Sequence, residues 1–487
     1  MPSGARIDID VSSFLVGNPN SRPDQPLSPF APPDHFDQTL QNFLNETSAR
    51  LCAWLASATQ RGPLPPLRML PEVAPLVEGR NAEGLLDDLQ MVMEGAFQPS
   101  HPGSLAHLDP PPLTASIAAD LICAGLNNNL LAEELSPSLS SLERQICAWF
   151  GERLGLPTKC GGVVASGGSL SNLMGLVVAR QHAGLQCNPH AVVFASADAH
   201  VSLAKAVRVM GLDEDGLQKI PVNHDGQIDL EKLTSTLKSL KASGRPCFAI
   251  VATAGTTFRG AVDPLIALAD LCSKDALWLH VDGAIGAAFA LSTSTASIVE
   301  GIHRADSITV NPQKILGITK TSSLLLVADR SALEMAFNTG LPYMEPPWGD
   351  QAHGGEIGLQ GSRSAEVLKL WLGLRQLGEQ GMNHLLETSL QRRHYLQMNL
   401  NSTNLQLLSG PLHLIACTPM HSDLADVESW STQTRQSLID HQIMVSRPFY
   451  QGRHFLKMVL GNPNTQKQHL DLLAELLNQS VMMTADG

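Results

Sequence analysis

The sequence predicts an α/β protein whose large domain is built on a mostly parallel β-sheet. Three observations support this prediction. The chain has 487 residues, 43% of them hydrophobic and 16% charged, so it can bury a large core and is too apolar to be disordered. From Gly162 onward, short apolar runs alternate with segments of helical periodicity. This alternation is typical of parallel strands that are joined by helices and covered by them on both faces.

The region before this alternation is expected to be an extended arm followed by helices. Residues 18–33 contain six prolines, so we expect a proline-rich extended arm over residues 1–35. Apolar residues then return at helical spacing from Phe36 to about Ala58. Two further helices are expected, over Leu113–Leu131 and over Leu142–Leu154.

The alternating region supplies the predicted sheet. Because ligands bind at the carboxyl ends of parallel strands, polar residues that follow these strands are candidates for a functional site. The expected strands are Val163–Ala165, Ala191–Ser196, Phe248–Thr253, Leu277–Asp282, Ser307–Val310 and Leu324–Ala328. The expected helices between them are Ser169–His182, Val201–Met210, Leu230–Lys241 and Pro264–Ser273.

The C-terminal part is expected to form a smaller α+β domain. A Gly/Pro-rich loop, Gly340–Gly361, precedes a predicted helix over Ala365–Leu377, and strands are expected near Leu405–Leu408, Leu412–Cys417 and Leu456–Leu460. We therefore divide the chain into four parts: the arm (1–35), an N-terminal helical segment (36–110), the large α/β domain (111–380) and the small domain (381–487).

Composition argues against several classes of function. The formal charge of −13 disfavours broad nucleic-acid binding, which needs basic patches. No apolar run approaches a membrane helix in length, and the N-terminus lacks the pattern of a signal peptide. The eight cysteines are scattered without a C-x-x-C pair, which indicates free thiols in a reducing, cytoplasmic compartment. We expect no metal site and no membrane or nucleic-acid partner.

The first candidate site is Ser166-Gly167-Gly168-Ser169, between a predicted strand and a predicted helix. Glycines let the backbone approach an anion closely, and the free N–H groups and dipole of a helix N-terminus favour negative charge. The pattern matches neither of the common nucleotide-binding loops. An ordinary strand–helix turn with a serine cap remains the alternative.

Two charged residues follow neighbouring strands. Asp282 ends an apolar strand, where a buried carboxylate needs a partner such as a protonated ring nitrogen. Lys314 lies in Asn311-Pro312-Gln313-Lys314, and its apolar neighbours would lower its pKa by desolvation. A lysine of this kind can form a Schiff base with an aldehyde. The alternatives are a structural ion pair for the aspartate and a solvated surface position for the lysine.

Two further strand ends carry residues suited to a ligand. His200, in Asp198-Ala199-His200, would project over the same edge of the sheet and could stack on a flat ring, although a structural role is the alternative. The stretch that begins at Thr253 has small and hydroxylic residues that permit close approach. Together, a phosphate cradle, a stacking histidine, a carboxylate and a Schiff-base lysine match the requirements of pyridoxal 5′-phosphate.

These motifs resemble those of the group II pyridoxal-phosphate-dependent amino-acid decarboxylases, which have the fold-type-I, aminotransferase-like fold. The family includes glutamate, cysteine-sulfinate, aromatic-amino-acid and 2,4-diaminobutyrate decarboxylases, and the resemblance covers roughly residues 40 to 475. The segments that carry it are His101-Pro102, Leu105-Ala106-His107-Leu108, Leu135-Ser136-Pro137, Ser166–Leu173, Ala199–Ser202, Ala252–Thr257, His280-Val281-Asp282, Asn311–Lys314, Ser362-Arg363 and Leu368–Trp371.

The resemblance implies a role for each matching residue. Lys314 would hold pyridoxal 5′-phosphate as a Schiff base, Asp282 would keep the pyridine nitrogen protonated so that the ring becomes an electron sink, and His200 would stack on the ring. The remaining cofactor residues would be Gly168, Ser169 and Asn311 at the phosphate, Gln313 beside the lysine, and Thr253 and Ala284 against the ring.

Two residues are implied in substrate binding. His107 aligns with a position that lines the substrate pocket, and Arg363 with one that meets the substrate carboxylate, which a guanidinium group can bind through two hydrogen bonds. A structural ion pair is the alternative for Arg363. The resemblance also implies a homodimer with active sites at its interface, in which residues 36–110 serve as a dimerisation segment.

The sequence departs from the family pattern at three positions. Gln313 replaces the usual histidine before the lysine and can donate a hydrogen bond but cannot carry a proton. Gly283 replaces a common alanine, which we interpret as opening space. The family's loop tyrosine, which protonates the carbanion, has no certain counterpart: Tyr343, which lies near the Gly340–Gly361 loop, and His353 within it are the candidates.

We therefore expect an enzyme that converts an L-amino acid, of the 2,4-diaminobutyrate or glutamate type, to the corresponding amine and CO2. Loss of the tyrosine leaves open oxidation to an aldehyde by the same fold and cofactor. A non-catalytic homologue that serves as a binding or scaffold protein is the third possibility, which the retention of Lys314, Asp282 and His200 argues against.

Overall fold

The computed structural model describes residues 27–70, 73–340, 353–420 and 422–482. Most of the expected proline-rich arm and Tyr343 lie outside these residues. The chain divides into two compact units, residues 1–101 and 102–487. None of the helices in the described segments combines the length and apolarity needed to cross a bilayer.

The first unit is helical. The helix expected from Phe36 is present as α1 (Gln38–Ala56), which begins where the Asp37 carboxylate accepts hydrogen bonds from the first free N–H groups. Helix α2 covers Ala58–Arg61, and α3, which the sequence analysis did not predict, covers Ala82–Glu94. Arg50 on α1 donates to the backbone oxygen of Leu86 on α3 at 2.9 Å. Helix α1 buries none of its residues, and α3 buries only Leu86.

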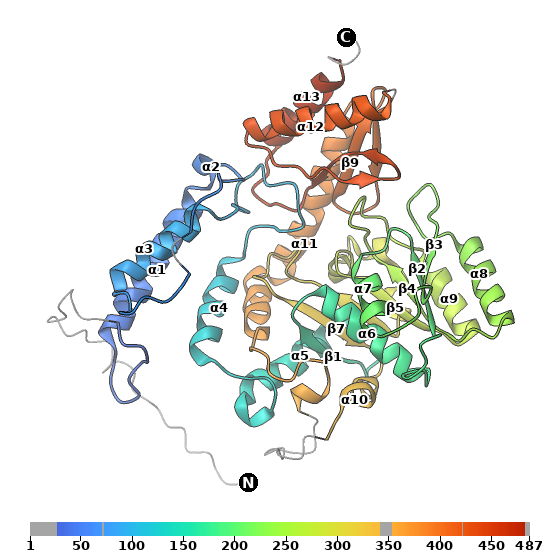
Figure 1. Cartoon of the computed structure of the whole chain (residues 1–487), viewed down its shortest axis with the longest axis horizontal. Helices are drawn as coiled ribbons and strands as arrows, with labels where there is room; N and C mark the ends of the chain where they lie inside the picture. Colours follow the sequence, from blue (N-terminus) through green and yellow to red (C-terminus); the bar gives the residue numbers. More distant parts are fainter. Residues whose placement is uncertain (1–26, 71–72, 341–352, 421, 483–487) are drawn as a thin grey trace. The chain divides into compact units, whose positions relative to one another are not determined.

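The second unit contains the predicted sheet, which has seven strands in the order β1-β7-β6-β5-β4-β2-β3 (Figure 1). Neighbouring strands pair in parallel except for β7, which is antiparallel to both β1 and β6. All six expected strands are present, and only the edge strand β3 was missed. The strands are β1 (Gly161–Ala165), β2 (Val192–Ser196), β3 (Leu217–Ile220), β4 (Cys247–Thr253), β5 (Trp278–Gly283), β6 (Ser307–Val310) and β7 (Ser323–Val327).

Helices cover both faces of this sheet, as predicted. Alternate residues of β1, β4 and β7 enter separate hydrophobic cores, so that Val164, Ile250 and Leu324 belong to one core and Val163, Val251 and Leu325 belong to the other. The helices of the large domain are α4 (Thr114–Leu126), α5 (Pro137–Arg153), α6 (Gly168–His182), α7 (Ser202–Val209), α8 (Leu230–Ala242), α9 (Leu265–Asp275) and α10 (Ser331–Phe337). Short 3-10 helices cover Glu133–Leu135, Ala287–Leu291, Ala296–Val299, Ile302–Arg304 and Gly354–Glu356.

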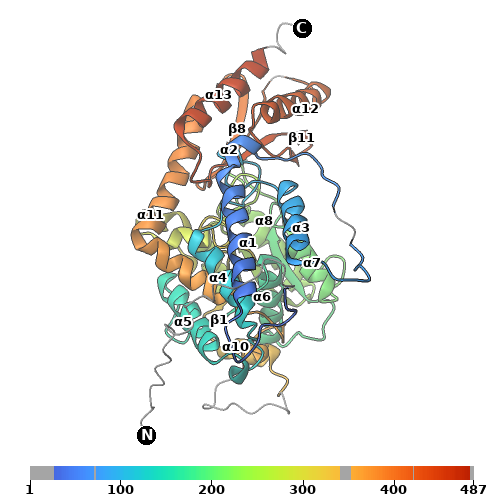
Figure 2. The ribbon, with the colours of Figure 1, turned by 90° about the vertical axis from the view of Figure 1, so that its left-hand side faces the viewer.

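Two helix ends differ from the prediction for conformational reasons. Helix α4 ends at Leu126, five residues earlier than expected, because Asn127 takes a left-handed conformation with φ 45° and caps it. The helix expected over Ala365–Leu377 continues as α11 (Val367–Asn399) beyond a break at Gly378, where φ is 58°. In Figure 2, α11 passes along the second unit and reaches α13.

The small C-terminal α+β part is present as expected. Its antiparallel sheet has the order β12-β9-β8. Residues 103–105 also join it, because Leu105 donates to the Met444 oxygen and accepts from the Val459 N–H. Residues 102–110, which we assigned to the N-terminal segment, therefore belong to the second unit. The elements are β8 (Leu405–Ser409), β9 (Leu414–Pro419), β10 (Phe449–Tyr450), β11 (Arg453–His454), β12 (Leu456–Val459), α12 (Leu424–Asp440) and α13 (Lys467–Met482).

Candidate active site

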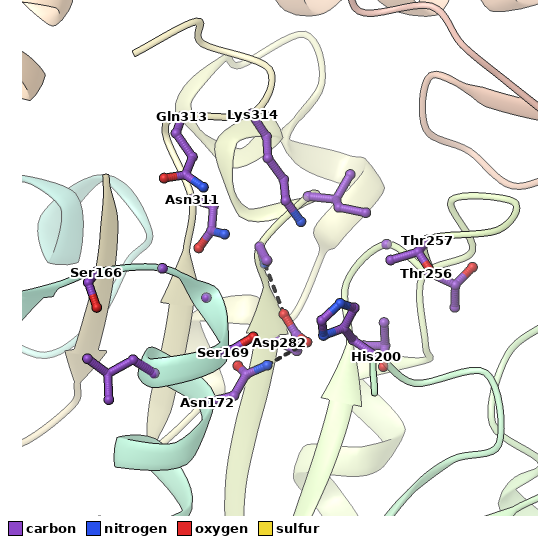
Figure 3. A pocket seen from close by; sticks show the side chains of 17 residues that line it. Ser166, Ser169, Asn172, His200, Thr256, Thr257, Asp282, Asn311, Gln313 and Lys314 are labelled. Carbon is purple, nitrogen blue, oxygen red and sulfur yellow. Dashed lines mark hydrogen bonds between the residues drawn. The ribbon is translucent and has the colours of Figure 1, made fainter. Parts of the chain in front are cut away.

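A cavity of about 400 Å³ lies where the carboxyl ends of the parallel strands meet. The segments that follow β1, β2, β4, β5 and β6 each contribute to its wall (Figure 3). Segments that follow five different strands, and are far apart in the sequence, therefore meet in one site. All nine residues expected to bind the cofactor line this cavity: Gly168, Ser169, His200, Thr253, Asp282, Ala284, Asn311, Gln313 and Lys314.

One end of the cavity is built to receive an anion. Helix α6 begins at Gly168; the N–H groups of Leu170 and Ser171 donate to the Gly167 oxygen, which leaves those of Gly168 and Ser169 at the helix start without an acceptor among the described residues. Gly167 has φ 139°, a conformation that favours glycine. A Cβ atom at Gly168 would lie 2.7 Å from Asn311 Nδ2, so only glycine leaves room there. The turn and the asparagine therefore form a narrow cradle.

Two amide side chains, Asn311 beside this cradle and Gln313 elsewhere on the cavity wall, have their oxygens held by the protein. The Asn311 oxygen accepts a hydrogen bond from Ser323 Oγ at 2.7 Å, and the Gln313 oxygen accepts one from Ser322 N–H at 2.6 Å. Because both oxygens are engaged, both amide nitrogens remain available as donors. Gln313 can therefore donate to a bound anion, as the sequence analysis inferred from its replacing a histidine.

Lys314 extends into the cavity from the turn after β6 (Figure 3). Burial lowers the pKa of its ammonium group, although the charges of Asp282 and Asp109 oppose this effect. Among the described residues, none forms a hydrogen bond or an ion pair with its Nζ atom. An amine with a lowered pKa and no partner is suited to nucleophilic attack on an aldehyde.

Asp282 and His200 face this amine from the floor of the cavity (Figure 3). Asp282 is 4% exposed and accepts hydrogen bonds from Asn172 Nδ2 at 2.8 Å and from Ala284 N–H at 3.2 Å. Burial lowers the pKa of His200, with the Asp282 charge acting in the opposite direction. The imidazole is therefore neutral at pH 7, which suits stacking against a flat ring.

The cavity fits a phosphorylated pyridine aldehyde. Thr253 Oγ1 is buried, lines the cavity and has no hydrogen-bond partner in the described part of the chain. A buried hydroxyl without a partner is costly, so a ligand atom is the natural group to satisfy it. With the anion cradle at one end, Asp282 below and the Lys314 amine above, the arrangement meets each requirement of pyridoxal 5′-phosphate.

The two residues expected to bind substrate lie in different surroundings. His107 lines a smaller pocket that shares Lys314 and also contains Asp109 and His413, which places it next to the cofactor cavity. Arg363 does not line the cavity. Its guanidinium group is 6% exposed and bonds to Glu143 at 2.7 Å and to the Gly354 oxygen at 3.2 Å. The structure thus favours the structural ion pair, because the buried guanidinium group is neutralised by Glu143 and lies outside the lining of the cavity.

The candidates for a loop acid are placed only in part. Tyr343 lies outside the described residues. His353 is buried outside the lining of the cavity, and its Nδ1 accepts from the Glu133 N–H at 3.4 Å. The other tyrosines are engaged elsewhere: Tyr395 with Asp471 and Tyr450 with Asp198.

Our interpretation of Gly283 as a space-opening change is wrong. A Cβ atom there would lie 2.8 Å from the Thr309 oxygen and 2.7 Å from the Ala287 Cβ. Glycine is therefore needed so that the end of β5 can approach β6 and the turn that follows.

The sequence analysis missed two polar residues of the site. Asn172 lines the cavity and binds Asp282; it lay in a motif that we had quoted without giving it a role. Lys457, on β12, donates to the oxygen of the cavity residue Thr257 at 3.2 Å. Burial lowers the pKa of Lys457, and the charge of Lys314 lowers it further. A lysine on a strand of another domain gives no local signal in the sequence.

Comparisons with known proteins agree with the geometry. Residues 66–409 match the family model described as the pyridoxal-dependent decarboxylase conserved domain. An L-2,4-diaminobutyrate decarboxylase from Rhizobium meliloti (strain 1021) is 28% identical over 437 residues, which cover 88% of this chain and 87% of that protein.

Solved structures share the fold. Mouse CSAD in its apo form has a TM-score of 0.83 at 23% identity, covering 91% of this chain and 99% of that one. Oryza sativa TDC with PLP and tryptamine has a TM-score of 0.86 at 21% identity, covering 93% and 99%. The fold is therefore the expected fold-type-I arrangement. Since the family model spans well over half of the chain, this protein belongs to the pyridoxal-5′-phosphate-dependent (group II) decarboxylase family.

Proposed function

We propose that this enzyme removes the α-carboxylate of an L-amino acid of the 2,4-diaminobutyrate or glutamate type, giving the amine and CO2. The observation that carries the proposal is the unpartnered Lys314 amine, buried above Asp282 and His200 in one cavity. The Rhizobium relative, named as a diaminobutyrate decarboxylase, supports this substrate class.

Each of these site residues would have a defined part in this reaction. The cofactor, when bound, would supply a ring that accepts the electron pair left when CO2 departs. The Asp282 carboxylate would hold a proton on the ring nitrogen, which would make the ring a better acceptor. His200 would stack against the ring, and the α6 turn with Asn311 and Gln313 would hold the phosphate. Lys314 Nζ would hold the aldehyde carbon and, once released, would hold a proton near the substrate.

Lys457 is the group that we assign to the substrate carboxylate in place of Arg363. Its ammonium is held by the oxygen of Thr257, which lines the cavity, and its pKa is lowered by burial and by the Lys314 charge. An anion bound between these two ammonium groups relieves their repulsion. Arg363, by contrast, is already neutralised by Glu143.

Oxidation to an aldehyde is the second candidate reaction. Two of the three tyrosines of the chain are hydrogen-bonded to aspartates away from the cavity, and Gln313 cannot carry a proton. If protonation of the carbanion is slow, dioxygen becomes the competing acceptor. One dioxygen and one water are then consumed per amino acid, and the products are the aldehyde, ammonia, CO2 and hydrogen peroxide.

We also propose a cytoplasmic homodimer. Three apolar side chains on α4, Leu121, Ile122 and Leu126, are each about half exposed. Helix α1 buries none of its residues. Apolar surfaces of this kind are typical of subunit interfaces. All eight cysteines are free thiols, which supports a reducing compartment.

A panel of L-amino acids tests the reaction. The purified enzyme, loaded with pyridoxal 5′-phosphate, is assayed for CO2, amine, aldehyde and hydrogen peroxide in parallel. We expect CO2 and amine in equal amounts from 2,4-diaminobutyrate or glutamate. Equal amounts of aldehyde and peroxide would instead identify the oxidative reaction, and no CO2 from any amino acid would contradict both. Lys457→Met is expected to raise KM, with Lys238→Met, an exposed position on α8, as control.

A further inference from the structure

A chain of buried polar side chains connects the cofactor cavity with the interior of the large sheet. Trp278 and His280 lie on β5, Ser307 lies on β6, and Asn172 lies on α6; none is more than 7% exposed. Trp278 Nε1 donates to Ser307 Oγ at 2.8 Å. Ser307 Oγ lies 2.8 Å from His280 Nδ1, and His280 Nε2 lies 3.1 Å from Asn172 Oδ1.

The direction of these hydrogen bonds follows from the carboxylate at the cavity. Asp282 can only accept, so Asn172 turns its Nδ2 to Asp282 and its Oδ1 to His280 Nε2. Because Asn172 Oδ1 can only accept, the single proton of the neutral imidazole is on Nε2, and His280 Nδ1 accepts the hydroxyl proton of Ser307, whose oxygen accepts from the Trp278 indole. That proton is donated to Asn172 Oδ1. Burial lowers the pKa of His280 to about 4, against the effect of the Asp282 charge, so the ring is neutral at pH 7.

Because its oxygen accepts from His280, the Asn172 amide must turn its two N–H groups toward the cavity. One donates to Asp282 Oδ2 at 2.8 Å, and the other donates to Ser202 Oγ at 2.9 Å. Ser202 then donates its hydroxyl proton to His200 Nδ1 at 2.9 Å. One amide group thus holds both the carboxylate below the ring and the serine that orients the stacking histidine (Figure 3).

The packing of α6 on β5 depends on the same histidine. A Cβ atom at Gly175 would lie 2.6 Å from His280 Cε1, so the helix can lie this close to the ring only with glycine at that position. Gly175 is one turn from Asn172 on the same helix. The close approach therefore brings the Asn172 oxygen within hydrogen-bond distance of His280.

We propose that Asn172 is a positioning residue of the cofactor site and that His280 fixes the orientation of its amide. The reversed amide would place its oxygen against the Asp282 carboxylate, which is repulsive, and would leave His280 Nε2–H facing another donor. The proposal rests on the proposed function only in that Asp282 and His200 face the cofactor. The orientation itself is a property of the protein without cofactor or substrate.

The first test measures the protonation of His280 in the cofactor-free protein. Two-bond 1H–15N spectra of histidine-labelled protein at pH 7 are expected to show a protonated Nε2 and an unprotonated Nδ1 for the residue whose signals disappear in His280→Gln. A proton on Nδ1 would overturn the proposal, because the Asn172 amide would then be reversed. This result needs no activity, so it stands apart from the outcome of the substrate panel.

The second test measures coupling between the two residues. The cofactor-free protein is titrated with pyridoxal 5′-phosphate, and we expect Asn172→Ala and His280→Leu each to weaken binding about tenfold, or about 1.4 kcal/mol. The double variant is expected to bind the cofactor within about twofold of either single variant. Both substitutions remove the same hydrogen bond between Asn172 and His280, so their effects should not add. His280→Gln, whose amide can donate to Asn172, is expected to bind within about threefold of the wild type.

The matched control is Ser171→Ala, since Ser171 neighbours Asn172 on α6 and its buried hydroxyl has no hydrogen-bond partner among the described residues. Its cofactor affinity is expected to be unchanged. Additive losses in the double variant, or unchanged binding by Asn172→Ala, would overturn the proposal. If a variant does not fold, the wild-type protonation state still decides the matter.

Discussion

Several side chains that face the cavity have one polar group fixed by the protein and another left for the ligand. The oxygens of Asn311 and Gln313 accept from serines, so their N–H groups are free. His200 accepts at Nδ1 from Ser202, so in its neutral form the proton is on Nε2. Preorganisation of this kind lowers the cost of ordering the site when the cofactor binds.

Asp282 is the residue whose charge matters most to the rate. We expect Asp282→Asn to lower kcat about 10²–10³-fold, the loss typical of removing one preorganised electrostatic group, because a neutral amide cannot hold the ring nitrogen protonated. Steady-state kinetics of the cofactor-saturated variant measure this. Asp225→Asn, at an exposed loop position, serves as control. Turnover within a few-fold of wild type would be incompatible with the assigned role.

The residues at the strand ends could be predicted from the sequence because each followed a recognisable apolar strand. Lys314, Asp282 and His200 were predicted in this way, and all three line the cavity. The sequence could not decide between a substrate-binding and a structural role for Arg363. Its partner Glu143 is far from it in the sequence, and no local pattern connects the two residues. Lys457 was missed for the same reason, since it lies on β12 and contacts the cavity residue Thr257, which is far from it in the sequence.

Helix α6 is the element on which the site depends most. Its N-terminus forms the anion cradle, Asn172 in its second turn holds Asp282, and Gly175 admits His280. The spacing of its apolar residues was enough to predict the helix. The sequence did not reveal how closely it approaches β5, because that distance depends on the contact between Gly175 and the His280 ring.

Filling the cradle at the start of α6 is expected to weaken cofactor binding. In Gly168→Ala the new Cβ atom would lie 2.7 Å from Asn311 Nδ2, which must move and lose its orientation. We expect the dissociation constant for pyridoxal 5′-phosphate to rise at least about tenfold, a loss of about 1.4 kcal/mol. Fluorescence titration of the cofactor-free protein measures it.

Gly381→Ala is the matched control for this variant. Gly381 lies within α11, and a Cβ atom added there would lie no nearer than 3.4 Å to a neighbouring atom, which is an ordinary contact, so alanine should leave cofactor affinity unchanged. It should also stabilise the helix by roughly 0.5–1 kcal/mol. Equal affinities of Gly168→Ala and wild type would exclude the cradle as the phosphate site.

Other elements show where sequence patterns reach their limit. The edge strand β3 has only one fully buried residue, so its apolar signal is weak. The break in α11 at Gly378 interrupts a segment that is helical on both sides, and the sequence prediction therefore stopped there. Strand β7 was predicted, but its antiparallel direction was not. The direction depends on the path of the segment between β6 and β7, and the apolar pattern gives no information about that path.

At the scale of the whole molecule, buried histidines are expected to make the protein sensitive to acid. Burial lowers the pKa of His413 to about 3 and that of His280 to about 4. In the unfolded chain both return to about 6.5. Below that pH the unfolded chain binds protons that the native state excludes, so the free energy of unfolding falls as the pH falls.

His413→Gln isolates one of these contributions. Between about pH 6 and pH 4.5, the wild type is expected to lose about 1.4 kcal/mol more stability per pH unit than the variant. Urea unfolding at a series of pH values measures the difference. His384→Gln, an exposed position on α11, should follow the wild type. If the free energy of unfolding varied with pH in the same way for wild type and His413→Gln, the pKa of His413 would not be lowered in the native state.

The exposed apolar side of α4 is expected to be covered in a homodimer. Ser116 and Ala119 are buried within the subunit, whereas Leu121 and Ile122 are 48% and 53% exposed. Light scattering is expected to give twice the 52.2 kDa chain mass for the wild type and a smaller mass for Ile122→Glu. Met398→Glu, at an exposed position on α11, should not change the mass. A monomeric wild type would refute the dimer.

The central claim is that the Lys314 amine binds the aldehyde of pyridoxal 5′-phosphate. It is tested most directly by loading the protein with the cofactor, reducing it with borohydride and locating the added mass by peptide mass spectrometry. We expect the phosphopyridoxyl group on the peptide that contains Lys314, and none on the Lys314→Ala protein. A modification on another lysine, or on none, would contradict the account.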